Sequence, residues 1–123
     1  MSTHALTKVV EDGDVLVAMY THWDGYPNSY GKELYNFLKD ITVVNGIRET
    51  DEKIANGMGC LAAQLVAHFK DEPGNIYLMP TDTEDEEYTY VITLNQNTNN
   101  LEVELNGVKV PLETFNLMCE NDT

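Results

Sequence analysis

Residues 88–110, YTYVITLNQNTNNLEVELNGVKV, have the pattern of three consecutive β-strands joined by tight turns. Residues 88–94 alternate and are rich in β-branched and aromatic side chains, and residues 101–105 alternate in the complementary pattern. The polar run between them predicts one turn, and Asn106-Gly107 is a strong hairpin signal before residues 108–110. Strands joined by such short turns pair antiparallel, so this stretch predicts part of an antiparallel sheet.

The N-terminal third predicts a second hairpin. Residues 3–10 and 14–21 are β-rich and flank the turn signal Glu11-Asp12-Gly13. Both faces of the second segment are apolar, which is typical of a central strand. Residues 76–79 are short and apolar between a glycine and a proline, and they predict one more strand.

Two longer helices are expected between these strands. The first begins after a cap at Asn28 or Ser29 and ends near Asp40. Its apolar positions follow helical spacing: Tyr30, Leu34, Phe37, Leu38 and Ile41. Residues 42–51 then read as a connector.

The second helix is expected to begin near Asp51, with Thr50 or Asp51 as its cap, and to end before the DEPG turn at 71–74. Its apolar stripe is Ile54, Met58, Leu61, Leu65 and Phe69. A parallel stripe of small residues, Gly59, Ala63 and Ala67, suggests that a neighbouring backbone comes close. The alternative is that Gly57 and Gly59 open the first turn for a ligand.

A short terminal helix, residues 112–117, follows Pro111 and precedes an acidic tail. The resulting order is ββααββββα. It predicts a single α+β domain over residues 1–118, with an antiparallel sheet of about 5–6 strands and two main helices on one face. Residues 119–123 are expected to form the short acidic tail.

Composition indicates a folded domain. The chain has 123 residues, of which 42% are hydrophobic, and no apolar run approaches the roughly 20 residues that span a bilayer. The N-terminus lacks the basic start and apolar stretch of a signal peptide, so we expect a cytoplasmic protein. Cys60 and Cys119 are expected to stay reduced there.

Charge is the strongest compositional signal. The formal net charge is −14, and residues 71–123 contribute most of it, with Lys109 as their only base. Such a field repels nucleic acid and acidic membranes and favours basic partners. The candidate docking residues are the carboxylates of the 82–87 loop and two on one strand face: Asp82, Glu84, Asp85, Glu86, Glu87, Glu102 and Glu104. The alternative is that the acidity only keeps the protein soluble.

Residues 22–27, HWDGYP, form a second candidate site, which we call the box. In extended backbone His22 and Asp24 would point to the same side, where a carboxylate could orient an imidazole for acid–base catalysis. Against catalysis, Asp24-Gly25 is a turn signal and no nucleophile is evident. Trp23 and Tyr26 are typical of binding surfaces, and equally of a corner between sheet and helix.

The sequence contains no clear motif for a metal site or a nucleotide-binding site. His4, His22 and His68 are far apart in the sequence, and no HxH, HExxH or CxxC spacing occurs. His68, between two apolar residues of a predicted helix, is expected to be partly buried. GxGxxG, GxxxxGK[ST] and GxSxG motifs are absent as well. We expect no cofactor and no metal.

The N-terminal segment, MSTHAL followed by YTHWDGYPNSYGKEL at 20–34, resembles a family of small proteins encoded by bacteriophages and prophages. Residues 57–80, GMGCLAAQLVAHFKDEPGNIYLMP, and the EEYTY that follows at 86–90 extend the resemblance over most of residues 1–90. His4 stands where that family usually has arginine, and PTDTED at 80–85 is more acidic than its counterpart. The resemblance implies a phage origin and raises the expectation of host takeover or counter-defence.

Three functions are compatible with these patterns. The first is a non-enzymatic inhibitor in the host cytoplasm whose acidic C-terminal half binds a basic, nucleic-acid-handling host protein, with DNA mimicry as one route. The second is a small hydrolase or ligand-binding protein centred on the box. The third is a structural accessory protein with no enzymatic site.

Overall fold

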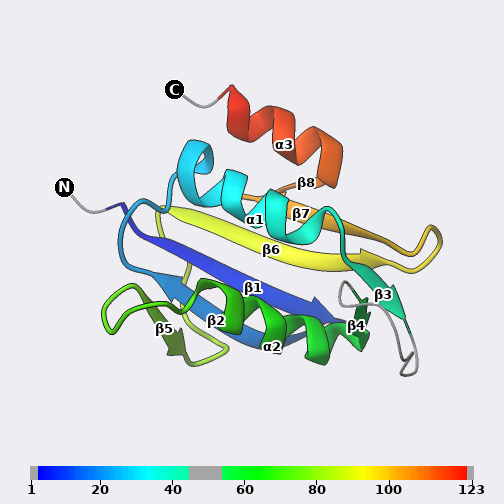
Figure 1. The fold of residues 1–123 in the computed structure, drawn as a ribbon, viewed down its shortest axis with the longest axis horizontal. Coiled ribbons are helices and arrows are strands. Elements are labelled where there is room, and N and C mark those ends of the chain that lie inside the picture. The colour runs from blue at the N-terminus through cyan, green and yellow to red at the C-terminus, as the bar shows by residue number, and fades with distance from the viewer. Residues whose placement is uncertain (1–2, 45–53, 122–123) are drawn as a thin grey trace.

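A six-stranded sheet in the order β5-β2-β1-β6-β7-β8 forms the centre of the molecule (Figure 1). The computed structural model describes residues 3–44 and 54–121. The strands of this sheet are β1 (Ala5–Glu11), β2 (Asp14–Thr21), β5 (Ile76–Met79), β6 (Tyr88–Asn95), β7 (Asn100–Leu105) and β8 (Val108–Pro111). The predicted class, a single α+β domain, is confirmed.

The hairpins form where alternation and turn residues predict them. β1–β2, β6–β7 and β7–β8 each pair antiparallel. Asp12-Gly13 and Asn106-Gly107 occupy the two tight turns with positive φ, at 52° and 84° in the first and 48° and 92° in the second. This left-handed backbone suits glycine and asparagine in two-residue hairpin turns.

One pairing differs from the predicted all-antiparallel sheet: β1 and β6 are parallel. β5 is antiparallel to β2 and therefore runs in the same direction as β1 and β6. The chain must return from the end of β5 to the start of β6, and it does so through the loop at 80–87 on the face opposite the helices. Two side-chain contacts join this loop to the N-terminal segment: an ion pair from Lys8 Nζ to Asp85 at 3.5 Å, and a contact from His4 Nδ1 to Glu86 at 3.7 Å.

The helices cover the other face of the sheet (Figure 1). They are a short π-helical turn η1 (Pro27–Gly31), α1 (Lys32–Leu38), α2 (Gly57–Phe69) and α3 (Leu112–Glu120). Alternate residues of the central strands point toward these helices and form one apolar core, which includes Met19, Leu34, Leu65, Ile92 and Phe115. Among the described residues no helix is long and apolar enough to cross a membrane.

The first helix begins differently from the prediction. Pro27 starts the π-helical turn, Tyr26 precedes it in extended conformation, and no side chain caps it, so Asn28 and Ser29 do not serve as caps. A proline is well placed here because its missing N–H would have no partner in a first turn. The helix ends at Leu38, and the supposed connector contains a short strand, β3 (Thr42–Val44).

The predicted start of the second helix is also wrong. Ile54 is not helical but begins a strand, β4 (Ile54–Asn56), which pairs parallel with β3. α2 begins only at Gly57, whose φ of +82° suits glycine at the switch from strand to helix. The proposed caps Thr50 and Asp51 lie outside the described residues.

α2 contacts the sheet through its large residues. The large apolar residues of α2 are buried: Met58, Leu61, Leu65 and Phe69. The small residues Gly59, Ala63 and Ala67 are exposed instead, so the predicted close approach of a neighbouring backbone along them is wrong. His68, expected to be partly buried, is exposed too and stacks on Phe37 with ring centroids 4.7 Å apart. Burial therefore follows the apolar stripe, as expected for an amphipathic helix.

α3 is longer than the predicted 112–117 and continues to Glu120. Cys119, placed by the sequence in an acidic tail, is fully buried in the core. Cys60 and Cys119 are not joined by a disulfide.

Candidate functional site

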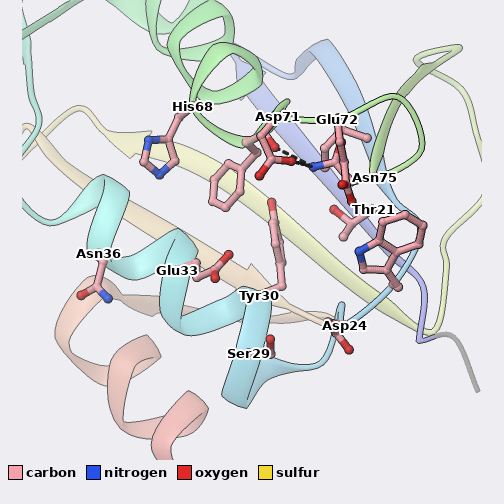
Figure 2. A pocket seen from close by; sticks show the side chains of 13 residues that line it. Thr21, Asp24, Ser29, Tyr30, Glu33, Asn36, His68, Asp71, Glu72 and Asn75 are labelled. Carbon is pink, nitrogen blue, oxygen red and sulfur yellow. Dashed lines mark hydrogen bonds between the residues drawn. The ribbon is translucent and has the colours of Figure 1, made fainter.

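A cavity of about 470 Å³ lies where the box meets the C-terminal end of α2 (Figure 2). Its walls come from the end of β2, η1, α1 and the loop between α2 and β5. The lining residues are Thr21, Trp23, Asp24, Ser29, Tyr30, Glu33, Asn36, His68, Phe69, Asp71, Glu72, Asn75 and Ile76. This volume is within the range that holds small organic ligands.

The box forms a tight corner that positions one wall. Gly25 lies so close to β1 that a Cβ at this position would be 2.6 Å from Ala5 Cβ. Its N–H donates to the Thr3 carbonyl at 2.9 Å, and its own carbonyl accepts from the Tyr90 hydroxyl at 2.8 Å. Asp24 turns the chain with φ of +57°, and its carbonyl accepts from the N–H of Tyr30 at 3.2 Å. The corner is therefore held both by the segment that leads into β1 and by β6.

Tyr30 forms the inner end of the cavity. Its hydroxyl is 2.5 Å from Thr7 Oγ1, and its ring packs against Phe69 and Tyr90 with centroids 5.1 Å apart in both pairs. Burial raises the pKa of Tyr30 well above its ordinary value, which the hydrogen bond to Thr7 only partly offsets. Tyr30 is therefore a neutral, structurally fixed group at physiological pH.

Asn75 organises the opposite wall. Its Nδ2 donates to the carbonyl of Phe69 at 2.8 Å and to Asp71 Oδ1 at 2.7 Å, which ties the loop to the end of α2. Its backbone carbonyl accepts from the N–H of His22 at 3.0 Å, which ties the same loop to the box. The two walls of the cavity are thus joined by a backbone hydrogen bond between His22 and Asn75.

Two side-chain oxygens of lining residues are enclosed by the protein. Thr21 is 6% exposed, and its hydroxyl lies beside that of Tyr30, where a hydrogen bond between them acts to lower the pKa of Tyr30. Oδ1 of Asn75 has no hydrogen-bond partner among the described residues. Both oxygens are so completely buried that a molecule in the cavity does not reach them.

The rim of the cavity is acidic. Asp24, Glu33, Asp71 and Glu72 are exposed carboxylates from three different segments, and the described lining residues include no lysine or arginine. In Figure 2 Asp71 and Glu72 come from the loop above Tyr30, and Asp24 and Glu33 from the segments below. Trp23, 40% exposed, adds an aromatic wall, and a Cβ at Gly74 would be 3.4 Å from its ring.

The predicted pair His22 and Asp24 is not brought together. His22 points to the face opposite the helices, where its Nδ1 is 3.1 Å from the Tyr20 hydroxyl and its ring stacks on His4 at 5.2 Å. Asp24 lines the cavity instead. The chain bends between the two residues, so the extended backbone that the pairing requires ends at Thr21.

Of the two aromatic candidates in the box, Trp23 lines the cavity, whereas Tyr26 is 39% exposed and does not. Among the described residues no three His, Cys, Asp or Glu side chains lie close enough to hold a metal ion.

The remaining predicted residues lie on the face of the sheet opposite the helices. In β7, Leu101, Val103 and Leu105 point into the core, so Glu102 and Glu104 point away from it. The loop at 80–87 crosses the same face and carries the rest of the set. We call this surface the acidic face: Asp82, Glu84, Asp85, Glu86, Glu87, Glu102 and Glu104.

Sequence reasoning did not find the residues that complete the cavity. In the sequence, Asp71 and Glu72 belong to the pattern that ends the second helix. Glu33 and Asn36 lie at positions of the first helix that are expected to face solvent. Only the box, with its single tryptophan, marked the location. Nothing local indicates that residues 68–76 lie against residues 21–36.

Comparisons with protein-family models, with curated proteins and with solved structures give no match to this chain.

Proposed function

We propose that this protein is a phage-encoded, non-enzymatic inhibitor that binds a basic, nucleic-acid-handling protein of its host through the acidic face. The observation that carries the proposal is the placement of carboxylates far apart in the sequence on one side of the sheet. The loop at 80–87 lies over β1, and Glu104 lies two strands away, opposite Val91 in the β6–β7 register.

Most of this charge is available to a partner. Asp82, Glu84 and Glu87 are exposed, and Lys8, a base on this face, is paired with Asp85. Lys109 is opposite Glu104 in the β7–β8 register. Dense carboxylates of this kind steer a basic protein and compete with the phosphates that it ordinarily contacts. The resemblance to phage proteins and the net charge of −14 agree with such a role in the host cytoplasm.

The experiment is affinity capture from a bacterial lysate on the immobilised protein. We expect bound host proteins that are basic, that elute between about 50 and 500 mM salt, and that duplex DNA displaces. Capture by the variant Asp82→Lys/Glu84→Lys should be lost. The matched control is Glu113→Lys/Glu120→Lys on α3, which makes the same charge change elsewhere and should capture normally.

Two results contradict the proposal. One is capture of the same proteins, at the same salt, by the wild type and the loop variant. The other is equal loss with both variants, because net charge alone would then explain binding. Far-UV circular dichroism and urea unfolding of each variant confirm that the exposed substitutions leave the fold intact.

A further inference from the structure

We infer that the free edge of β5 binds an extended, basic peptide segment of another protein, which joins the sheet as an additional strand. β5 is the outermost strand on its side of the sheet, next to β2 (Figure 1). The edge consists of backbone groups and has only Asp82 of the acidic face near it. The inference therefore does not depend on the inhibitor function.

Hydrogen bonds at the start of β5 show which of its backbone groups face outward. The carbonyl of Asn75 accepts from the N–H of His22 at 3.0 Å and so points toward β2. The next carbonyl, that of Ile76, accepts instead from Lys70 Nζ at 2.7 Å. Because this direction alternates along an antiparallel pair, Ile76 and Leu78 both present their N–H and carbonyl groups to the open side.

These outward groups are not paired with another strand. Among the described residues, neither the N–H of Ile76 nor the N–H or carbonyl of Leu78 takes part in a backbone hydrogen bond. Lys70 supplies one donor to the Ile76 carbonyl, a place that the N–H of an incoming strand would take. An edge with free donors and acceptors of this kind is a template for strand addition.

The side chains along the edge are apolar on both faces of the sheet. Tyr77, Leu78 and Met79 are exposed, and Leu78, at 61%, is the most exposed large apolar side chain among the described residues. Edge strands that avoid partners often carry charged residues or proline. β5 has neither within its four residues, so it suits a strand whose central side chains are apolar or uncharged.

Charge selects a basic partner over a second copy of this chain. Asp71 and Glu72 are exposed in the loop before β5, and Asp82 is exposed in the loop after it. Residues 70–87 hold seven carboxylates and one base, Lys70. A second copy would bring the same acidic segments together, whereas a strand with lysine or arginine at its ends places cations beside them.

The probe is a synthetic peptide with two lysines at each end and alternating valine and threonine between them, labelled for fluorescence anisotropy. The first control carries N-methyl groups on two adjacent central residues, which blocks both of its edges at unchanged charge. The second has glutamate in place of lysine.

We expect saturable binding of the unmethylated peptide, binding about tenfold or more weaker after methylation, and none with glutamate. Two results overturn the inference. One is the absence of saturable binding. The other is equal binding of the methylated peptide, because charge and apolar contact alone would then explain the affinity.

Variants of the protein test the same edge. Leu78→Pro removes an N–H that the β2–β5 ladder does not use, and should weaken the peptide about tenfold or more. Leu78→Ala keeps that N–H and should bind more tightly than Leu78→Pro; equal affinities would refute strand addition. Circular dichroism and urea unfolding check the fold of the proline variant, and the methylated peptide tests the edge without any substitution.

The charge contribution has its own matched pair. Asp71→Asn/Glu72→Gln should weaken the peptide several-fold, because it removes two carboxylates beside the start of β5. Glu113→Gln/Glu120→Gln makes the same charge change on α3 and should have a smaller effect. Equal effects of the two variants would contradict the selection of a basic partner by the acids that flank β5.

Sedimentation velocity tests the other occupant of the edge. We expect a monomer, and a dimer that Leu78→Pro abolishes would overturn the inference, since a second copy would then fill the edge. Leu78→Pro leaves the carboxylates of the acidic face in place and should capture host proteins from the lysate normally. Peptide binding at β5 and the inhibitor function can therefore fail independently.

Discussion

The hydroxyl of Tyr90, in the middle of β6, donates a buried hydrogen bond of 2.8 Å to the carbonyl of Gly25, 65 residues earlier in the chain. This bond joins the box to the centre of the sheet. It explains why the segment 22–27, which reads as an active-site motif, is first a structural corner.

Tyr90→Phe should lower the free energy of unfolding by about 1–3 kcal/mol, because it removes the donor to a buried carbonyl and keeps the ring contacts. Those contacts are with Tyr30 and Phe115, at centroid distances of 5.1 and 6.0 Å. Urea unfolding measures the change. Tyr77→Phe, at a position 47% exposed, is the control and should change little; equal effects would contradict the structural role of Tyr90.

Gly25→Ala should destabilise the protein by about 1–3 kcal/mol or more through overpacking. The new Cβ would be 2.6 Å from Ala5 Cβ and 2.9 Å from Ala5 N, and backbone cannot move aside cheaply. Gly59→Ala is the matched control in α2, where a Cβ meets nothing within 4 Å. It should stabilise by about 0.5–1 kcal/mol through helix propensity, so thermal unfolding should shift in opposite directions for the two variants.

Gly31 and Cys119 should be energetically coupled. A Cβ at Gly31 would be 2.7 Å from Cys119 Sγ, which is fully buried. Gly31→Ala should therefore destabilise, and adding Cys119→Ala should recover part of the loss because it removes the clashing sulfur. A double-mutant cycle in urea should give a coupling of about 0.5–3 kcal/mol; strict additivity would show that α3 is not packed on η1 as described.

Stability should fall at alkaline pH because of Tyr30. Burial raises the pKa of this phenol above its ordinary value of 10.0, so the folded state holds the proton more tightly than the unfolded state. The corresponding stability is complete below pH 10 and is lost as the pH rises from 10 toward the folded-state pKa. Unfolding measured from pH 9 to 11 should therefore show a steeper fall in the wild type than in Tyr30→Phe.

Tyr30→Phe should also lower the stability of the fold at neutral pH. Tyr30→Phe loses the hydrogen bond to Thr7 and should be about 1 kcal/mol less stable at pH 7. Burial also raises the pKa of Tyr20, so some alkaline loss should remain in the variant. An identical pH dependence in both proteins would rule out Tyr30 as the responsible group.

Local patterns predicted the strands well and the helix boundaries less well. Alternation in residues 88–94 and the Asn106-Gly107 turn are properties of neighbouring residues, and these elements form as expected. Ile54 was misassigned to a helix because its spacing to Met58 fits a helical stripe. Its actual environment is set by pairing with Thr42 across the chain, and the sequence around it does not encode that contact.

The candidate site shows the same division. Trp23 and Asp24 were recognisable because an unusual aromatic residue stands beside a turn signal. Thr21, Asn75 and Asp71 were not, because their place in the cavity depends on contacts between segments that are distant in the sequence.

By itself the sequence determined the α+β class, the hairpins and the uneven distribution of acidic charge. Alternation and turn residues act between neighbours in the chain, and net charge is the sum of the charges of individual residues. Only the tertiary structure decided the direction of β6 beside β1, the separation of His22 from Asp24 and the apposition of residues 68–76 on the box. Those features depend on how the chain crosses the sheet, and on which distant atoms then meet in its core.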